Sequence, residues 1–251
     1  MTIQVLLRLF SMLLLAAGVQ SAALAADVDP ARLLQLSDQA RGGGLPGLVW
    51  EVKATNSGSQ ANEEEGMRLL IKAIDNASLA ETLEPLRSKG GRMLQVERNM
   101  WLTKPGLKKP VPISPRQRLT GQAAIGDIAA TNYVRDYTPR LLREEAQGGE
   151  PCVVLELVAK RQQATYDRLL YWVSQARGVG VRAEFFSLSG KRLKTAQFEY
   201  GNKIQVQGKS IAFISRMSIA DELTDARTVL EYSQVRVKAL APAEFDVGHL
   251  E

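Results

Sequence analysis

The chain has 251 residues, a formal net charge of +5, one histidine and one cysteine. One thiol cannot close an intrachain disulfide, and the lone His249 lies third from the chain end, without the partners of a Ser-His-acid triad or a zinc site. Basic and acidic residues are interspersed, which indicates a solvated surface and no nucleic-acid partner. We therefore expect a protein that is not an enzyme and that holds no cofactor and no metal ion.

Residues 1–25 resemble a cleaved export signal. Arg8 stands beside an apolar run, and the segment ends in the small residues Ala23 and Ala25 that a signal peptidase requires. The run is shorter than the ~20 apolar residues of a membrane-spanning helix, and no cysteine follows it to carry a lipid anchor. We expect an exported chain that begins near Ala26 and forms a single domain over residues 26–251, with two small domains as the alternative.

The first element predicted after the signal is a helix within Asp29–Gly44. Asp29 can cap its first turn, Pro30 suits its first position, and three leucines within residues 33–36 form an apolar stripe. The glycines 42–44 end the helix. They lack the Lys-Ser/Thr of a phosphate-binding loop and follow a helix instead of opening one.

Most of the chain after residue 44 is predicted to form strands. In residues 48–54, apolar side chains recur at every second position, the period of a strand with one buried face. Similar runs occupy residues 67–74, 93–103, 152–159, 181–188 and 209–219, and Cys152 begins one of them. The last run places Ile211, Phe213, Ser215 and Met217 on one face.

Glycine, proline and asparagine mark the segments between these runs, as in hairpin turns. Strands that recur about every 10 residues with such turns indicate one large antiparallel sheet, curved or closed, and a mainly β (α+β) fold. Two further short helices are expected, at Ala77–Leu86 and Gly126–Tyr133. Since the helices are few, they are the candidates to cover an apolar face of the sheet.

Met100–Ser114 combines a tryptophan with prolines and lysines. Lys104-Pro105-Gly106 is typical of a hairpin tip, and the prolines at 110 and 112 indicate an edge strand, because proline cannot donate to a central ladder. The lysines at 104, 108 and 109 are interpreted as solvated edge protection, with contact to a lipid headgroup or a partner as the alternative.

Two acidic runs, Glu63–Glu65 and Asp221–Asp225, lack the ligand pattern of a calcium loop. Both stand between predicted strands and are interpreted as solvated turns, with a metal or acid/base site as the alternative. The pair Gly178 and Gly180 has no third glycine and no following helix, so it is interpreted as a turn and not as a dinucleotide-binding loop.

Seven aromatic residues lie in or beside the alternating runs: Trp50, Trp101, Trp172, Phe185, Phe186, Phe198 and Phe213. Most are interpreted as core. The alternative is that a large curved sheet with little helix to fill it leaves an apolar cavity that holds a ligand.

The stretch Asn99–Tyr133 resembles a family, the periplasmic outer-membrane lipoprotein-sorting proteins of the LolA-like superfamily (LolA/LolB/RseB-type fold). The matching residues are Trp101, Leu102, Pro105, Leu107, Ile113, Ser114 and Arg118. Tyr166–Phe198 is similar to a strand pair of that family, and the stretch that starts at Asp221 is similar to its closing strand. The sequence departs from the pattern at Lys104, Pro110 and Pro112.

The resemblance implies an incomplete antiparallel β-barrel whose few short helices form a lid over an apolar cavity. It also implies a monomer in the periplasm that carries lipid or lipoprotein acyl chains beside an RND-type inner-membrane exporter. An acyl chain gains ~0.8 kcal/mol per buried CH₂, so such a carrier needs an apolar cavity and no catalytic residue.

If each alternating apolar face turns inward, eight residues are candidates to line the cavity. They are Trp50, Val52, Leu94, Val96, Trp101, Phe185, Phe213 and Met217. A period of two does not show which face of a strand is concave, so this assignment rests on that assumption.

The leading hypothesis is therefore a periplasmic carrier of lipid or lipoprotein. The alternative is a non-catalytic sensory or protein-binding module of the same fold. An enzyme that acts on envelope glycan or lipid is a third hypothesis, and it requires carboxylates that converge in the cavity.

Overall fold

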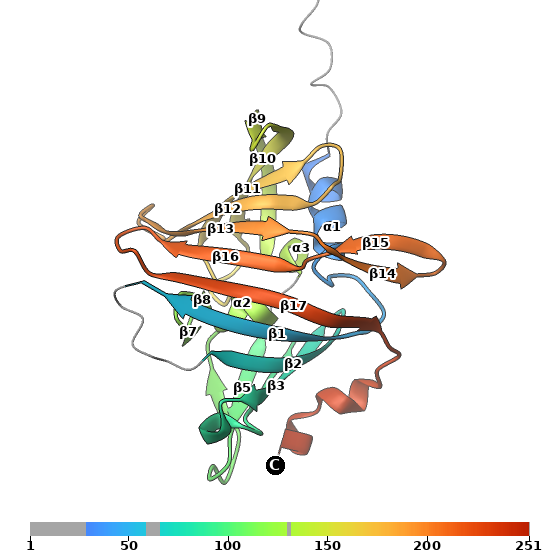
Figure 1. Ribbon diagram of the computed structural model, residues 1–251, viewed down its shortest axis with the longest axis vertical. Helices are drawn as coiled ribbons and strands as arrows, with labels where there is room; N and C mark the ends of the chain where they lie inside the picture. The colour runs from blue at the N-terminus through green and yellow to red at the C-terminus, as the bar shows by residue number, and fades with distance from the viewer. Residues whose placement is uncertain (1–28, 59–65, 130–131, 251) are drawn as a thin grey trace, which may run out of the picture.

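The computed structural model describes residues 29–58, 66–129 and 132–250. The predicted export signal and the acidic run Glu63–Glu65 lie outside these residues. The described chain is mainly β, with one large antiparallel sheet and a few short helices (Figure 1). This confirms the predicted fold class.

Thirteen strands of the described chain form the sheet, in the order β6-β5-β4-β3-β2-β1-β17-β16-β13-β12-β11-β10-β9. The long strand β17 pairs with β1, so both ends of the chain contribute to the middle of the sheet. The bounds are β1 (Leu48–Ser57), β2 (Met67–Ile74), β3 (Ala77–Glu84), β4 (Arg92–Val96), β5 (Asn99–Thr103), β6 (Val111–Ile113), β9 (Tyr137–Gln147), β10 (Glu150–Ala159), β11 (Arg168–Ser174), β12 (Gly180–Phe186), β13 (Arg192–Glu199), β16 (Arg216–Asp221) and β17 (Arg227–Val237).

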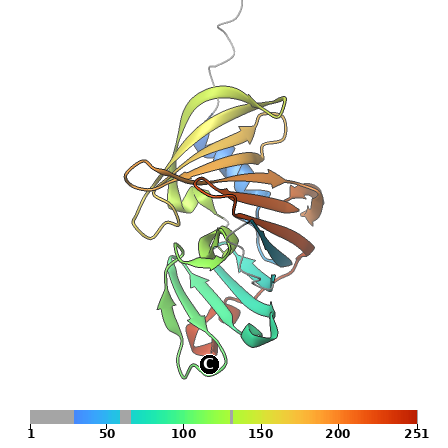
Figure 2. The same cartoon turned by 60° about the vertical axis from the view of Figure 1, so that its left-hand side comes forward.

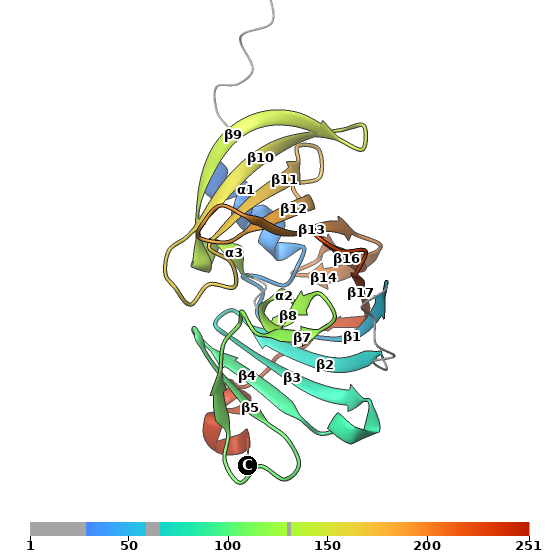
Figure 3. The same cartoon turned by 90° about the vertical axis from the view of Figure 1, so that its left-hand side faces the viewer.

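The sheet curves around three helices, α1 (Pro30–Gln39), α2 (Ile125–Ala129) and α3 (Tyr133–Asp136). Figures 2 and 3 show the two halves of the sheet bending towards each other around these helices. We call the helix-covered side the inner face and the other side the outer face. β6 and β9 are the two edges and do not pair with each other, so the barrel is incomplete.

Two small ribbons complete the β-structure. One pairs β7 (Arg118–Thr120) with β8 (Ala123–Ala124), and the other pairs β14 (Asn202–Val206) with β15 (Lys209–Phe213).

The helix α1 begins where the sequence predicts. The Asp29 carboxylate accepts a hydrogen bond from the Ala31 N–H at 2.9 Å, and Pro30 is the first helical residue. Leu34 is fully buried in the main core cluster. The chain then turns at Gly42, whose φ of 102° favours glycine, and leads into β1.

Two of the predicted strands are wrong, because each consists of two strands. Residues 93–103 form the hairpin of β4 and β5, with Glu97 at a φ of 54° in the turn. Residues 209–219 are divided between β15 and β16, and between them the Ile214 N–H donates to the Ala40 carbonyl at 2.9 Å. Apolar residues continue on both sides of the point where one strand ends and the next begins. A search for apolar residues at every second position therefore does not detect that point.

The predicted helix at Ala77–Leu86 is also wrong. Residues 77–84 form β3, which pairs with β2 on one side and β4 on the other. Its alanines, leucines and glutamates favour a helix intrinsically, but two neighbouring strands and alternate burial outweigh that weak preference. The helix predicted at Gly126–Tyr133 is confirmed in part. α2 ends at Ala129, residues 130–131 lie outside the described chain, and α3 begins at Tyr133 after its cap Asn132.

The hairpin predicted around Lys104–Gly106 is confirmed. The Leu107 N–H donates to the Lys104 carbonyl at 3.0 Å, and Gly106 has a φ of 92°. The strand β6 that follows is an edge of the sheet, with Pro112 opposite Trp101.

The buried apolar residues form a main cluster and two smaller ones. The main cluster lies between the inner face and the three helices. A second cluster lies on the outer face under the 3₁₀-helices η2 (Pro242–Phe245) and η3 (Val247–Leu250). The segment around His249 therefore packs on the sheet, although the His249 side chain itself is exposed. The third cluster contains Trp172 and Cys152, a buried cysteine that forms no disulfide bond.

Candidate functional site

The inner face holds five of the eight residues predicted to line a cavity. Trp50, Val52, Phe185, Phe213 and Met217 are almost completely buried in the main cluster with residues from the three helices. The Trp50 and Phe213 rings meet edge to face, with centroids 5.9 Å apart. Whether these side chains contact a ligand stays a prediction.

The other three predicted residues lie on the outer face. Leu94, Val96 and Trp101 belong to the second cluster, where η2 and η3 cover them with Phe245 and Leu250. The eight residues therefore do not line one surface. The alternation shows that a strand has two faces, and the choice between them comes from contacts with the chain's last residues, distant in sequence.

Sequence reasoning missed a buried cation on the inner face. Arg41, just after α1, is only 3% exposed. Its guanidinium carbon lies 4.2 Å from the centroid of the Tyr133 ring and 5.5 Å from that of Phe198. No carboxylate of the described residues forms an ion pair with it, and its Nη1 has no hydrogen-bond partner among them. The position in a run of loop residues offered no sequence signal for this burial.

Asp38, at the end of α1, is the buried carboxylate nearest to Arg41 in sequence. Its Oδ2 accepts a hydrogen bond from the Val134 N–H of α3 at 2.8 Å, whereas Oδ1 has no partner in the described chain. Burial raises the pKa of the Asp38 carboxyl to about 7, against the hydrogen bond from Val134 and the charge of Arg41, which lower it. The group therefore changes protonation state near neutral pH.

Further polar atoms on the inner face lack partners within the described residues. They are the Trp50 Nε1 and the Tyr171 hydroxyl, which lies beside Ser37 and Arg41. Burial raises the pKa of Tyr171 above its ordinary value, which is already far above neutral pH, so its hydroxyl keeps its proton. Because buried polar groups are normally paired, an unpaired buried donor such as the Arg41 Nη1 marks a place where a polar group of a ligand can bind.

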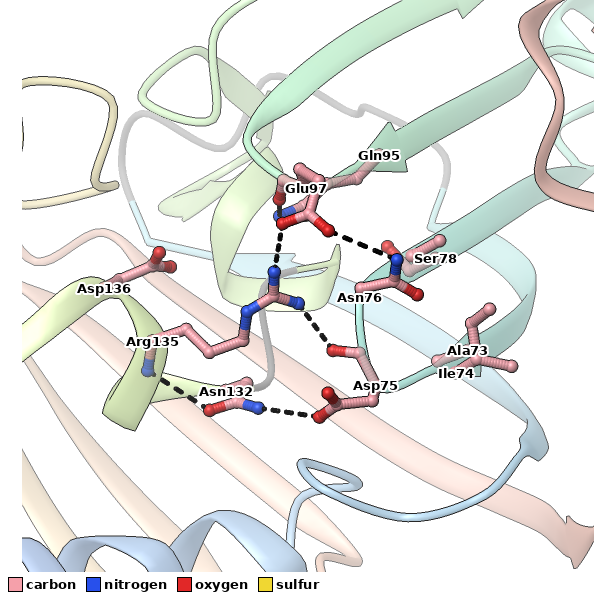
Figure 4. Close-up of a pocket in the computed structure, with 11 residues that line it drawn as sticks. Ala73, Ile74, Asp75, Asn76, Ser78, Gln95, Glu97, Asn132, Arg135 and Asp136 are labelled. Atoms are coloured by element: carbon pink, nitrogen blue, oxygen red, sulfur yellow. Dashed lines mark hydrogen bonds and ion pairs between the residues drawn. The ribbon is translucent and has the colours of Figure 1, made fainter. Parts of the chain in front are cut away.

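Figure 4 shows how α3 is attached to the rest of the molecule. The Arg135 Nη1 donates to the Asp75 carbonyl at 2.7 Å, and its other terminal nitrogen pairs with Glu97. Asn132 caps α3 and donates to the Asp75 carboxylate at 3.3 Å. These residues surround a polar cavity of about 30 Å³, enough for one or two water molecules.

More contacts hold α3 from the other side. The Arg98 Nη2 donates to the Arg135 carbonyl at 2.9 Å, and the Lys160 Nζ donates to the Val134 carbonyl at 2.7 Å. A helix of four residues is not stable alone, so its position depends on these polar contacts and on its apolar side.

The helix α2 is attached by a buried ion pair. Asp127 lies 2.8 Å from the Lys194 Nζ of β13 and accepts further hydrogen bonds from the Tyr166 hydroxyl at 2.8 Å and the Ala124 N–H at 2.8 Å. The Lys194 Nζ also donates to the Gln122 carbonyl at 2.6 Å. All polar groups of this pair that the structure shows are satisfied, so it holds α2 on the sheet.

The described chain contains no group of three or more histidine, cysteine, aspartate or glutamate side chains placed to hold a metal ion. Within the same residues, every helix is too short or too polar to cross a membrane.

Comparison with solved structures identifies the fold. A LolA superfamily protein from Nitrosomonas europaea is 30% identical, with a TM-score of 0.78, and the match covers 88% of this chain and 98% of that one. The chain belongs to the LolA superfamily. A family model described as an uncharacterized protein matches residues 75–251, and a search of curated proteins finds no match.

Two more distant structures share the LolA superfamily fold. One, described as an outer membrane lipoprotein-sorting protein domain, comes from Vibrio parahaemolyticus, with 20% identity, a TM-score of 0.72, and coverage of 88% of this chain and 97% of that one. The other is a DUF1329 family protein from Desulfovibrio piger, with 19% identity, a TM-score of 0.72, and coverage of 89% and 100%. The predicted resemblance is thereby confirmed.

Proposed function

We propose that the chain is a periplasmic carrier that binds a lipid, or the acyl chains of a lipoprotein, on its inner face and moves this cargo towards the outer membrane. One observation carries the proposal. The apolar inner face is covered by three short helices, and beneath them lies a cation, Arg41, whose Nη1 lacks a hydrogen-bond partner in the described chain. Membership of the LolA superfamily supports the same function.

In this proposal acyl chains take the place of α3 against the inner face. Each CH₂ that leaves water gains ~0.8 kcal/mol, which offsets the loss of the apolar surface that α3 covers on the inner face. The hydrogen bonds of Arg135 and Asn132 that hold α3 lie at partly exposed sites where water can replace them. Binding of this kind needs no catalytic residue.

Arg41 specifies the chemical class of the cargo in this proposal. A guanidinium presents donors in a planar fork that matches phosphate or carboxylate oxygens. The Tyr171 hydroxyl and the Trp50 Nε1 offer two more donors on the same face. We infer an amphiphile with an anionic headgroup, accommodated more readily when Asp38 is protonated.

Native mass spectrometry of the protein purified from the periplasm tests the carrier. We expect a bound anionic lipid or acylated peptide in the wild type and less of it in Arg41→Met. Arg182→Met is the matched control, because Arg182 also stacks on an aromatic ring, 4.8 Å from the centroid of Trp172, in the third cluster. Empty protein that carries a stoichiometric protein partner would instead favour the sensory module.

We extend the proposal to an RND-type inner-membrane exporter as the donor of the cargo, to a monomer, and to export with cleavage near Ala26. The support is the sequence resemblance and the signal-like residues 1–25. N-terminal sequencing of periplasmic protein, light scattering and cross-linking in intact cells test these points separately.

A further inference from the structure

The antiparallel order of the strands places alternate turns at opposite ends of the sheet. One end carries the described turns 85–91, 104–110, 160–167, 187–191 and 222–226, and we call it the leucine end. The turns before β13 and after β16 lie together at the left of Figure 1, with the β3–β4 and β5–β6 turns below them. The turns at the other end include 75–76, 97–98, 148–149 and 175–179.

The most exposed large apolar side chains of the described chain gather at the leucine end. Leu188 is 87% exposed, Leu86 83% and Leu223 72%, and each lies in a different turn. Leu107, in a fourth turn, is also exposed. The four turns named for the opposite end contain no exposed large apolar side chain.

These leucines form two neighbouring pairs. β13 and β16 pair directly, with Lys194 opposite Asp221, so the turns that carry Leu188 and Leu223 are adjacent. The turns that carry Leu86 and Leu107 adjoin where Gly90 faces Pro105. The leucines therefore project from separate tips and do not line a common groove.

Basic residues surround the leucines. The four turns that carry them contain six, Arg87, Lys89, Lys104, Lys108, Lys109 and Lys191, against two acidic residues, Glu222 and Asp225. Glu222 pairs with an arginine of the protein, Arg192. The four turns named for the other end hold two basic and two acidic residues. These numbers concern described residues, and Glu63–Glu65 lie outside them.

Two hollows adjoin the exposed leucines. Leu86 borders one of about 700 Å³ that Lys53 and Arg87 also line. Leu223 borders another of about 260 Å³ that extends past Lys191 to Lys194, the residue that holds α2. The basic residues at each wall outnumber the one carboxylate there, Glu84 in the first hollow and Asp221 in the second.

We propose that the leucine end docks on the surface of a membrane that contains anionic lipids. Leucines on separate tips suit a deformable apolar layer, because each can enter it alone, whereas a protein partner would need a continuous complementary patch. Lysines and arginines around them are attracted to anionic headgroups. Contact at this end would bring the membrane next to α2 and the inner face. The inference is independent of the carried lipid, since it concerns the surface of the empty protein.

Co-sedimentation with vesicles tests this docking. We expect the wild-type mature protein to bind vesicles of phosphatidylcholine with phosphatidylglycerol, and to bind weakly to phosphatidylcholine alone or at high salt. The triple variant Leu86→Ser, Leu188→Ser, Leu223→Ser should lower the partition coefficient at least about tenfold, because each leucine that enters the apolar layer contributes about an order of magnitude. The three substituted leucines are exposed, so the variant should fold like the wild type.

Two further variants test the apolar and the charged contributions to vesicle binding separately. Leu36→Ser, Leu141→Ser, Val237→Ser alters three exposed apolar residues elsewhere on the surface and should bind like the wild type. Lys104→Gln, Lys108→Gln, Lys109→Gln should lose the preference for phosphatidylglycerol. Equal binding by the two apolar triple variants, or no binding by the wild type, would overturn the proposal and favour a protein partner. Lipid occupancy of the inner face, measured by native mass spectrometry, should be unchanged in the leucine variant, so the two proposals can fail separately.

Discussion

Two buried polar clusters lie beneath the helices on the inner face, and they differ in how far their atoms are paired. Asp127 and Lys194 form an ion pair at 2.8 Å in which Tyr166, Ala124 and Gln122 supply further hydrogen bonds. Asp38 and Arg41 form no ion pair, and the Asp38 Oδ1 and Arg41 Nη1 have no partner among the described residues.

The difference separates a structural cluster from a candidate binding site. A buried ion pair stabilises a fold only when its remaining lone pairs and protons are satisfied, as around Asp127. Unpaired buried donors and acceptors have a free-energy penalty that a ligand can remove. The cluster at α2 is therefore complete in the protein alone, whereas the cluster at α1 and α3 is completed by a ligand in our proposal.

The largest expected effect is the loss of stability when the complete cluster is broken. Asp127→Asn leaves the Lys194 charge buried without a counter-charge and should lower the free energy of unfolding by about 3–5 kcal/mol. Asp167→Asn, which removes the partly exposed partner of Arg116, should cost only about 0–1 kcal/mol. Urea unfolding monitored by tryptophan fluorescence measures both. Equal losses would show that the two pairs do not differ as described.

The second effect is a pH dependence that originates from Asp38. Its pKa is raised from 3.8 to about 7 by burial, so between these values the folded protein binds a proton that the unfolded chain has lost. The contribution of Asp38 to the free energy of unfolding is therefore fully present below pH 3.8 and is lost as the pH rises through about 7. This free energy should fall by up to about 4 kcal/mol over that range. The difference in unfolding free energy between the wild type and Asp38→Asn, measured against pH, should follow this decline. A difference that does not vary with pH would assign the group an ordinary pKa.

The third effect has the opposite sign to the first. Arg41→Met keeps the length of the side chain and removes an incompletely paired buried charge, so the free energy of unfolding should be unchanged or rise by about 1–2 kcal/mol. Arg182→Met should instead lose about 1 kcal/mol, because it breaks the ion pair with Glu184, a kind of contact that Arg41 lacks within the described residues. Thermal unfolding of lipid-free protein gives the comparison. A loss of about 3 kcal/mol or more in lipid-free Arg41→Met would make Arg41 structural.

The smallest effect concerns the attachment of α3. Arg135→Ala removes the hydrogen bond to Asp75 and the ion pair with Glu97, and should lower global stability by only about 1 kcal/mol. Amide hydrogen exchange at residues 132–136 should nevertheless become faster, because Arg135 makes two of the polar contacts that hold this helix of four residues. Arg140→Ala, which removes an exposed ion pair with Glu156 on β9 and β10, is the control and should leave exchange at α3 unchanged. Unaltered exchange in Arg135→Ala would mean that the remaining polar contacts and the apolar packing of α3 suffice.

The sequence alone determined those features that depend on neighbouring residues. Asp29 and Pro30 set the start of α1, Lys104–Gly106 set a hairpin, and alternation of apolar residues set the mainly β class, because caps, turns and strand periodicity are local. The motif at Asn99–Tyr133 was sufficient to suggest the superfamily.

Tertiary structure decided what depends on distant residues. Ala77–Glu84 became a strand because β2 and β4 flank it, and Leu94 and Trp101 face outward because the last residues of the chain cover them. Arg41 has the sequence context of a solvent-exposed loop residue, yet it is buried because the rings of Tyr133 and Phe198, 92 and 157 positions further along, enclose its side chain. A pattern of period two or 3.6 contains no information on such contacts, so the most distinctive group of the inner face was visible only in the folded chain.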